Sequence, residues 1–219
     1  MKALILGSKS EIAADIYQRL IEDGWTVRGW HRDSRKMPEF RWNVCLIPMG
    51  RIAPVGHWSE LDDKEFDQCV ESNVLLPARL LRSVWYLREQ PTSVCFFAGS
   101  NPQKPMAGFA PYNLGKMALL KLCEQLDFET PEAKFFALAP GYVATKIHQQ
   151  TIAKGWKNER IERGNPTPPH KIYEALMWCI NQPKEVVGGR NICVTDLRGD
   201  LDKRLKENPS MFKLRRVEA

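Results

Sequence analysis

A tyrosine and a lysine lie four residues apart in the segment YNLGK, from Tyr112 to Lys116. On an α-helix this spacing places both side chains on one face, so the lysine ammonium can lie beside the phenol. A neighbouring positive charge favours the phenolate and brings the tyrosine pKa down from about 10, toward what proton transfer at neutral pH requires. The same spacing also arises by chance on amphipathic helices, so the pair alone leaves its chemistry open.

Short apolar runs alternate with longer helical patterns along the chain. Strands are predicted at residues 2–7, 25–30, 43–50, 93–100, 134–141 and 190–196. Helices are predicted at about residues 10–23, 62–89, 111–128 and 169–181. The strands are apolar throughout, whereas half-buried strands are apolar at every second residue. This pattern indicates an α/β protein with a parallel sheet covered by helices on both faces.

The composition favours one domain over residues 1–219, because 43% of the residues are hydrophobic. The net charge of +6 suits phosphate-bearing ligands, but it accompanies no recognition motif, so no nucleic-acid partner is expected. The first apolar run is too short for a secretion signal, and no segment is long enough to cross a bilayer. The cysteines form no CxxC pair and lie mostly in apolar runs, which indicates reduced thiols in a cytoplasmic protein. The histidine spacing predicts no metal site.

The first predicted strand ends at Gly7, and a short polar turn leads into a helical pattern in which Ile12, Ile16 and Leu20 face one side. This is the order of a dinucleotide-binding turn, although only one of the usual three glycines is present. The free N–H groups at the start of such a helix favour a bound phosphate. Ser10 either caps this helix or contacts the phosphate.

Taken together, these segments resemble the short-chain dehydrogenase/reductase family over nearly the whole chain. The family's catalytic Asn, Ser, Tyr and Lys match Asn73, Ser100, Tyr112 and Lys116, with separations similar to those of the family. The later segment LAPGYVATKI resembles the family's PGxVxT motif. The matching residues of this motif are Pro140, Gly141, Val143 and Thr145.

The resemblance implies an oxidoreductase in which NADPH delivers hydride to a carbonyl substrate, or accepts it from a secondary alcohol in the opposite direction. Tyr112 would give the alkoxide its proton, and Ser100 would hydrogen-bond that oxygen. Lys116 would hold the nicotinamide ribose and lower the pKa of Tyr112, while Asn73 would position a water between Lys116 and solvent. Thr145 would bond the nicotinamide carboxamide or a phosphate.

The sequence departs from the family at both glycine-bearing turns. The family's GxxxGxG aligns with Gly7, Glu11 and Ala13, and a carboxylate at Glu11 would repel the pyrophosphate unless it turns outward. Ile47 and Pro48 stand where the family has two asparagines, although Gly50 is kept.

The chain is also shorter than the family plan between Gly7 and Gly50, by roughly thirty residues or one βα unit. We therefore predict a single-domain, Rossmann-like, doubly wound parallel sheet of about six strands. It lacks the third strand of the family plan, which leaves the adenine site more open.

Cationic residues near the end of the second predicted strand favour NADP(H) over NAD(H), because a 2′-phosphate is bound by Arg or Lys. Asp33, the only acid there, could still serve NAD(H), and the cations could simply be solvated surface charges. The residues expected at the cofactor are Gly7, Lys9, Ser10, Ile12, Arg28, His31, Arg32, Gly50, Tyr112, Lys116, Pro140, Gly141, Val143 and Thr145.

Two segments near the C-terminal end are less regular. Residues 146–170 are predicted to form a lid-like loop, or an insertion without a role, in which Trp156 either stacks on a substrate or packs the loop down. Residues 200–219 form a basic tail that could dock, through Met211, Phe212 and Leu214, on a neighbour or on its own domain.

Family relatives associate through the helices that carry the asparagine and the tyrosine, so the resemblance implies a homodimer or homotetramer. Two other functions stay open beside the oxidoreductase. One is a non-catalytic NADP(H)-binding sensor, and the other is a reductase that modifies nucleotide sugars.

Overall fold

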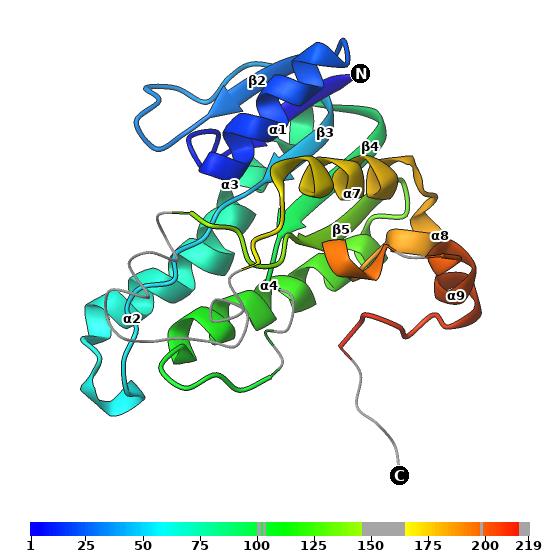
Figure 1. Cartoon of the computed structure of the whole chain (residues 1–219). Helices are drawn as coiled ribbons and strands as arrows, with labels where there is room; N and C mark the ends of the chain where they lie inside the picture. Colours follow the sequence, from blue (N-terminus) through cyan, green and yellow to red (C-terminus); the bar gives the residue numbers. More distant parts are fainter. Residues whose placement is uncertain (100–101, 103, 146–164, 198, 215–219) are drawn as a thin grey trace.

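The computed structural model describes residues 1–99, 102, 104–145, 165–197 and 199–214. Its centre is one parallel sheet of six strands in the order β2-β1-β3-β4-β5-β6 (Figure 1). The strands are β1 (Lys2–Leu6), β2 (Thr26–Trp30), β3 (Trp42–Ile47), β4 (Arg88–Phe97), β5 (Ala133–Ala139) and β6 (Asn191–Cys193). The strand order reverses direction beside β1, which is the doubly wound, Rossmann-like arrangement expected from the sequence.

Helices cover both faces of this sheet (Figure 1). One face carries α1 (Glu11–Glu22) and α7 (Pro169–Asn181), followed by the short helices α8 (Lys184–Val187) and α9 (Leu201–Glu207). The other face carries α2 (Asp63–Val70), the π-helical turn η2 (Glu71–Leu75), α3 (Leu76–Val84) and α4 (Ala110–Glu129). The described residues also form three single 3-10 turns, which are η1 (Trp58–Glu60), η3 (Trp85–Leu87) and η4 (Val194–Asp196).

The two cores follow from the alternation of side chains along each strand. In β1, Ala3 and Ile5 belong to the core under α1 and α7, whereas Leu4 and Leu6 belong to the core under α3 and α4. Because both faces are buried, every residue of β3 and β5 is buried, and this explains the continuous apolar runs in the sequence.

The trimmed sheet is confirmed. Within the described residues no strand pairs with the outer side of β2, so β2 is the edge strand next to β1. The chain then runs directly to β3, and Met37 and Phe40 of this connection pack against the core under α3 and α4. A more open adenine site stays a prediction.

The expected helix over residues 62–89 is wrong in its extent. It is interrupted at η2, its regular part ends at Val84, and β4 already begins at Arg88.

The tail docks on its own domain as far as the structure describes it. Residues 201–207 form α9, whose Leu201 and Leu205 are buried, and Met211 and Phe212 pack against the same core. Leu214 packs against the core of the other face.

Three basic side chains hold backbone carbonyls at the ends of helices. Lys134 Nζ donates to three carbonyls at the end of α7. Lys184 Nζ donates to the carbonyls of Asp127 in the last turns of α4, Thr130 just after this helix and Ala133 at the start of β5. Arg190 donates to five carbonyls around α8, α9 and the segment after it. Cations are favourable at helix C-termini, so part of the positive charge has a structural role.

Candidate active site

The predicted site residues lie on elements that meet at one edge of the sheet. The turns after β1, β3, β4 and β5 all leave the carboxyl ends of parallel strands, and α4 begins beside them. In open α/β sheets this edge is where ligands bind.

Lys116 is buried beneath this edge, with an exposed fraction of 4%. Its Nζ donates hydrogen bonds to the carbonyl of Met49 at 3.0 Å and to the carbonyl of Phe97 at 2.8 Å. It therefore joins the turn after β3 to the end of β4. An ammonium group has three N–H donors, so one remains beyond these two bonds. Burial lowers the pKa of Lys116 to about 8, since the low-dielectric interior disfavours its charged form.

Tyr112 lies one helical turn before Lys116 on α4. Its hydroxyl is close to the end of β4, because a Cβ added to Gly99 would lie 3.4 Å from the phenol oxygen. Burial raises the pKa of Tyr112 to about 12, and the nearby Cys69 thiol adds to the rise. This is opposite to the lowering expected from Lys116, because burial disfavours the charged phenolate and the hydrogen bonds of the lysine go to carbonyls.

Asn73 is fully buried inside the π-helical turn η2. Such turns are rare in proteins as a whole, and those that occur often lie at functional sites. The Asn73 amide nitrogen donates to the carbonyl of Arg51 at 2.7 Å and to the carbonyl of Cys69 at 2.8 Å. Its amide oxygen is buried and has no hydrogen-bond partner among the described residues.

Gly50 separates the Asn73 oxygen from Lys116. A Cβ added at this glycine would lie 2.7 Å from Asn73 Oδ1 and 2.8 Å from Lys116 Nζ. Only a residue without a side chain therefore fits where the turn after β3 meets the Asn73 oxygen and the Lys116 ammonium. The water predicted to link Asn73 and Lys116 stays a prediction.

The sequence motifs did not predict two features of the site, a close contact between helices and an apolar cluster. Gly115, inside YNLGK, lets α4 approach η2, because a Cβ there would lie 2.7 Å from Asn73 Cβ. A glycine inside a helical pattern is the signal that could have indicated this contact. Ile52, Val55 and Phe109 form an apolar cluster that packs against Tyr112, and no sequence pattern pointed to it.

The turn after β1 has the conformation that its single glycine predicts. Gly7 has φ of +100°, and a Cβ on it would lie 2.7 Å from Met49 Cγ, so only glycine fits there. The Ser10 hydroxyl accepts a hydrogen bond from the Ala13 amide at 3.1 Å. Ser10 is thus the N-cap of α1, and a contact between Ser10 and phosphate stays a prediction.

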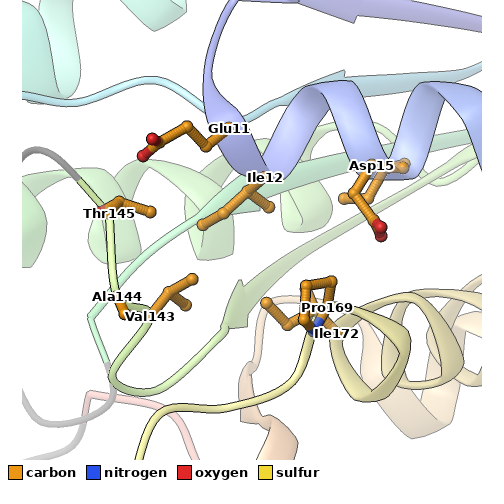
Figure 2. A pocket seen from close by; sticks show the side chains of 9 residues that line it. Glu11, Ile12, Asp15, Val143, Ala144, Thr145, Pro169 and Ile172 are labelled. Carbon is orange, nitrogen blue, oxygen red and sulfur yellow. The ribbon is translucent and has the colours of Figure 1, made fainter.

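A pocket of about 200 Å³ lies between the start of α1, the segment after β5 and the start of α7 (Figure 2). Ile12, Val143 and Thr145, all expected at the cofactor, line it together. Glu11 lines it as well, and Figure 2 shows its carboxylate extending toward Thr145. Glu11 has therefore not turned away from the pocket.

The PGxVxT segment leaves β5 through a sharp turn. Pro140 is buried, and Gly141 has φ of +83°, a conformation that favours glycine. A Cβ on Gly141 would lie 2.6 Å from the Thr167 hydroxyl, and the Thr167 amide donates to the Tyr142 carbonyl at 2.6 Å. The turn is thereby fixed against the segment that precedes α7.

The basic residues near the end of β2 gather around one carboxylate. Lys9 Nζ lies 3.0 Å from Asp33 Oδ2, His31 Nδ1 lies 3.8 Å from it, and Arg32 Nε lies 4.0 Å from Asp33 Oδ1. Lys9 holds the pKa of Asp33 below its usual value. Arg28 lies apart from this group, with its guanidinium 5.8 Å from the centre of the Phe40 ring.

Some expected residues cannot be placed. Ser100 and Trp156 lie outside the described residues, as does the lid-like loop of 146–170 apart from residues 165–170. In the described part of the chain, no group of His, Cys, Asp or Glu is arranged to hold a metal ion. No helix among the described residues is long and apolar enough to cross a membrane. All six cysteines are buried, and none of them forms a disulfide bond.

The chain is similar to known proteins both in sequence and in fold. A family model described as short chain dehydrogenase matches residues 45–155, just over half of the chain. A search of curated protein sequences gives no match.

Solved structures resemble the chain more widely. A small-chain dehydrogenase in complex with NADPH has a TM-score of 0.76 at 16% identity, covering 88% of this chain and 95% of that one. Ligand-free aldohexose dehydrogenase from Thermoplasma acidophilum has a TM-score of 0.74 at 13% identity, covering 91% and 95%. A short chain dehydrogenase family protein from Francisella tularensis has a TM-score of 0.73 at 12% identity, covering 88% and 96%. At such identities the likeness shows the fold alone.

Proposed function

Because this chain belongs to the short-chain dehydrogenase family, we propose that it is an NADP(H)-dependent oxidoreductase acting on a carbonyl or a secondary alcohol. The observation that carries the proposal is the convergence of Asn73, Tyr112 and Lys116 at the carboxyl edge of the sheet. Sequence spacing alone could not show that the asparagine oxygen and the lysine ammonium both closely approach Gly50.

The residues present fit a dinucleotide at this edge. The tight turn at Gly7 brings the start of α1 to the end of β1, where its N-terminal N–H groups suit a phosphate. The pocket of about 200 Å³ accommodates only part of a dinucleotide and places Ile12, Val143 and Thr145 around that part. The bound nicotinamide would supply or accept the hydride.

Tyr112 would act as the proton donor to the substrate oxygen. Its pKa of about 12 keeps the phenol protonated at neutral pH, which suits carbonyl reduction. Lys116 would contribute its remaining N–H to the nicotinamide ribose, and its pKa of about 8 lets it exchange a proton near neutrality. Ser100 would hydrogen-bond the same oxygen as Tyr112.

NADP(H) is preferred because Lys9, His31 and Arg32 lie together around Asp33, at the strand end where the ribose of the adenosine would bind. A 2′-phosphate could replace the Asp33 carboxylate as the partner of Lys9 and Arg32. Asp33 is already engaged by Lys9, which leaves it less suited to ribose hydroxyls.

The protein is also proposed to associate as a homodimer or homotetramer. Apolar side chains are exposed on the helices through which family relatives associate, notably Leu75 on η2 with Leu114 and Phe128 on α4. Exposed apolar surface of this kind favours association. The six buried thiols suit a reducing compartment such as the cytoplasm.

The test is turnover of purified protein with a panel of aldehydes and ketones, followed by nicotinamide absorbance. We expect oxidation of NADPH with a higher kcat/KM than for NADH, and tighter binding of NADPH in a titration. Tighter binding of NADH would contradict the cofactor preference. Binding of NADPH without turnover, in either direction, would favour the sensor, a function that the carboxylate of Glu11 in the pocket also favours.

Replacing Gly50 with alanine is expected to lower kcat by about a hundredfold, the lower end of what a positioned proton-transfer group contributes. The added Cβ would lie 2.7 Å from Asn73 Oδ1 and 2.8 Å from Lys116 Nζ, so these side chains would have to shift. Steady-state kinetics across pH measure the effect. Gly56→Ala is the matched control, because its Cβ meets only the flexible Leu61 side chain, at 3.0 Å. Equal kcat values for the two variants would contradict a catalytic role for the close approach of Asn73 and Lys116 to Gly50.

Replacing Glu11 with glutamine is expected to tighten NADPH binding by about three- to tenfold, because a carboxylate in the pocket repels the cofactor phosphates. Fluorescence titration at low salt measures the dissociation constant. Glu22→Gln makes the same charge change at the far end of α1 and should leave it unchanged. Weaker binding by the Glu11 variant would show that this carboxylate helps to hold the cofactor.

A further inference from the structure

We propose that the Cys69 thiol is a positioning residue that fixes the side-chain amide of Asn73 with its oxygen toward Lys116. The catalytic consequence of this inference rests on the proposed function, whereas the contacts among Cys69, Arg51 and Asn73 do not depend on that function. Cys69 lies on α2, one helical turn before Asn73, and is fully buried.

The thiol and the asparagine share one acceptor. Cys69 Sγ donates to the Arg51 carbonyl at 3.3 Å, and Asn73 Nδ2 donates to the same carbonyl at 2.7 Å. The sulfur also lies 3.6 Å from Asn73 Nδ2. The amide nitrogen is thus surrounded by two carbonyl oxygens and a sulfur, all of which can accept a hydrogen bond.

This environment determines the orientation of the amide. If the amide turned over, Asn73 Oδ1 would face the carbonyl oxygens of Arg51 and Cys69, two acceptors that it cannot satisfy. With the nitrogen held on that side, the oxygen lies against Gly50, which the Lys116 ammonium also approaches, and it has no hydrogen-bond partner among the described residues. The amide thus presents an acceptor, and not a donor, toward the lysine.

Cys69 also anchors the segment on which this arrangement depends. Arg51 directly follows Gly50, so a thiol that holds the Arg51 carbonyl also holds the backbone beside Gly50. The Arg51 side chain is bound to the same helix, with Nη1 2.9 Å from Gln68 Oε1 and Nη2 3.4 Å from Glu65 Oε1. The segment is therefore attached to α2 through its carbonyl and its guanidinium group.

Loss of the thiol should change the pKa of Lys116, and with it the charge of this lysine near neutral pH. The titratable groups that face the lysine in the described structure are Tyr112 on its own helix and Cys69 on α2, with Arg51 close to the thiol. An amide turned to present its N–H₂ would disfavour the ammonium further. The basic limb of the kcat profile, expected near pH 8, would then move to lower pH.

The experiment compares Cys69→Ala with Cys69→Ser, whose hydroxyl can still donate to the Arg51 carbonyl. Cys123→Ala, a buried thiol of α4 in the core under α3 and α4, is the matched control for the cavity that the substitution leaves. The first readout is hydrogen exchange of the Asn73 side-chain amide by NMR. The second is the pH profile of kcat, measured together with NADPH affinity.

For Cys69→Ala we expect side-chain amide exchange to be faster by about tenfold or more, as loss of one buried hydrogen bond implies. Its kcat profile should shift to lower pH while NADPH affinity stays within about twofold. Cys69→Ser should restore both readouts, and Cys123→Ala should change only the melting temperature. Unchanged exchange in Cys69→Ala, or the same profile as Cys123→Ala, would overturn the proposal. A wild-type protein without turnover would contradict the proposed function, whereas the exchange readout would still decide whether Cys69 holds the amide.

Discussion

Replacing Tyr112 with phenylalanine should reduce turnover by about a thousandfold, within the range that positioned proton donors contribute. Only the hydroxyl is lost, because the ring that packs against Ile52, Val55 and Phe109 is retained. Lys116 keeps its bonds to the carbonyls of Met49 and Phe97, so NADPH affinity should stay within about threefold. Single-turnover oxidation of bound NADPH measures the hydride step, and a fluorescence titration measures the affinity.

The matched control is Tyr86→Phe, which removes a hydroxyl from a tyrosine that is 70% exposed. It should leave both quantities unchanged. Turnover by Tyr112→Phe within about tenfold of wild type would exclude the phenol as the proton donor. Loss of turnover together with loss of NADPH affinity would point to damage at the cofactor site.

The parts of the site that follow from local periodicity could be predicted from the sequence. Tyr112 and Lys116 are four residues apart on α4, so their common face needs only a helix. The single glycine of the first turn was enough to predict its conformation, since φ of +100° at Gly7 is a local requirement. The shortened connection between β2 and β3 likewise predicted that β2 would be the edge strand.

The electrostatics of the same residues could not be predicted in this way. The sequence suggested that Lys116 lowers the pKa of Tyr112, whereas burial raises that pKa to about 12. The lysine is bound by the Met49 carbonyl from the turn after β3 and by the Phe97 carbonyl at the end of β4, and only the folded arrangement brings these together. The orientation of the Asn73 amide depends in the same way on carbonyls from separate segments.

Tertiary contacts also determine which of the basic residues can bind a ligand and which have a structural role. The sequence assigned the positive balance to phosphate ligands, and Lys9, His31 and Arg32 remain available for that role around Asp33. Lys134, Lys184 and Arg190 are instead occupied by backbone carbonyls, away from the carboxyl edge of the sheet. A count of charges could not separate these two groups, because burial and helix ends distinguish them.

Replacing Arg190 with methionine should lower the free energy of unfolding by about 3–5 kcal/mol, the range for breaking a buried hydrogen-bond network. Arg190 is 2% exposed and donates five hydrogen bonds, with Nη1 2.6 Å from the Val186 carbonyl and Nη2 2.9 Å from the Leu205 carbonyl. Methionine fills similar space but leaves all five carbonyls without this donor. Urea denaturation followed by circular dichroism measures the loss.

The controls separate the hydrogen bonds from the charge. Arg79→Met removes a guanidinium that is 61% exposed and paired with Glu71, so its effect should stay within about 0.5 kcal/mol. Arg190→Lys keeps the positive charge but cannot reach five carbonyls at once, so it should lie between wild type and Arg190→Met. A loss below about 1 kcal/mol for Arg190→Met would mean that water replaces the guanidinium. In that case α8, α9 and the segment after them would be held to the sheet by the apolar packing of Val186, Leu201 and Leu205, together with the hydrogen bonds that Lys184 donates.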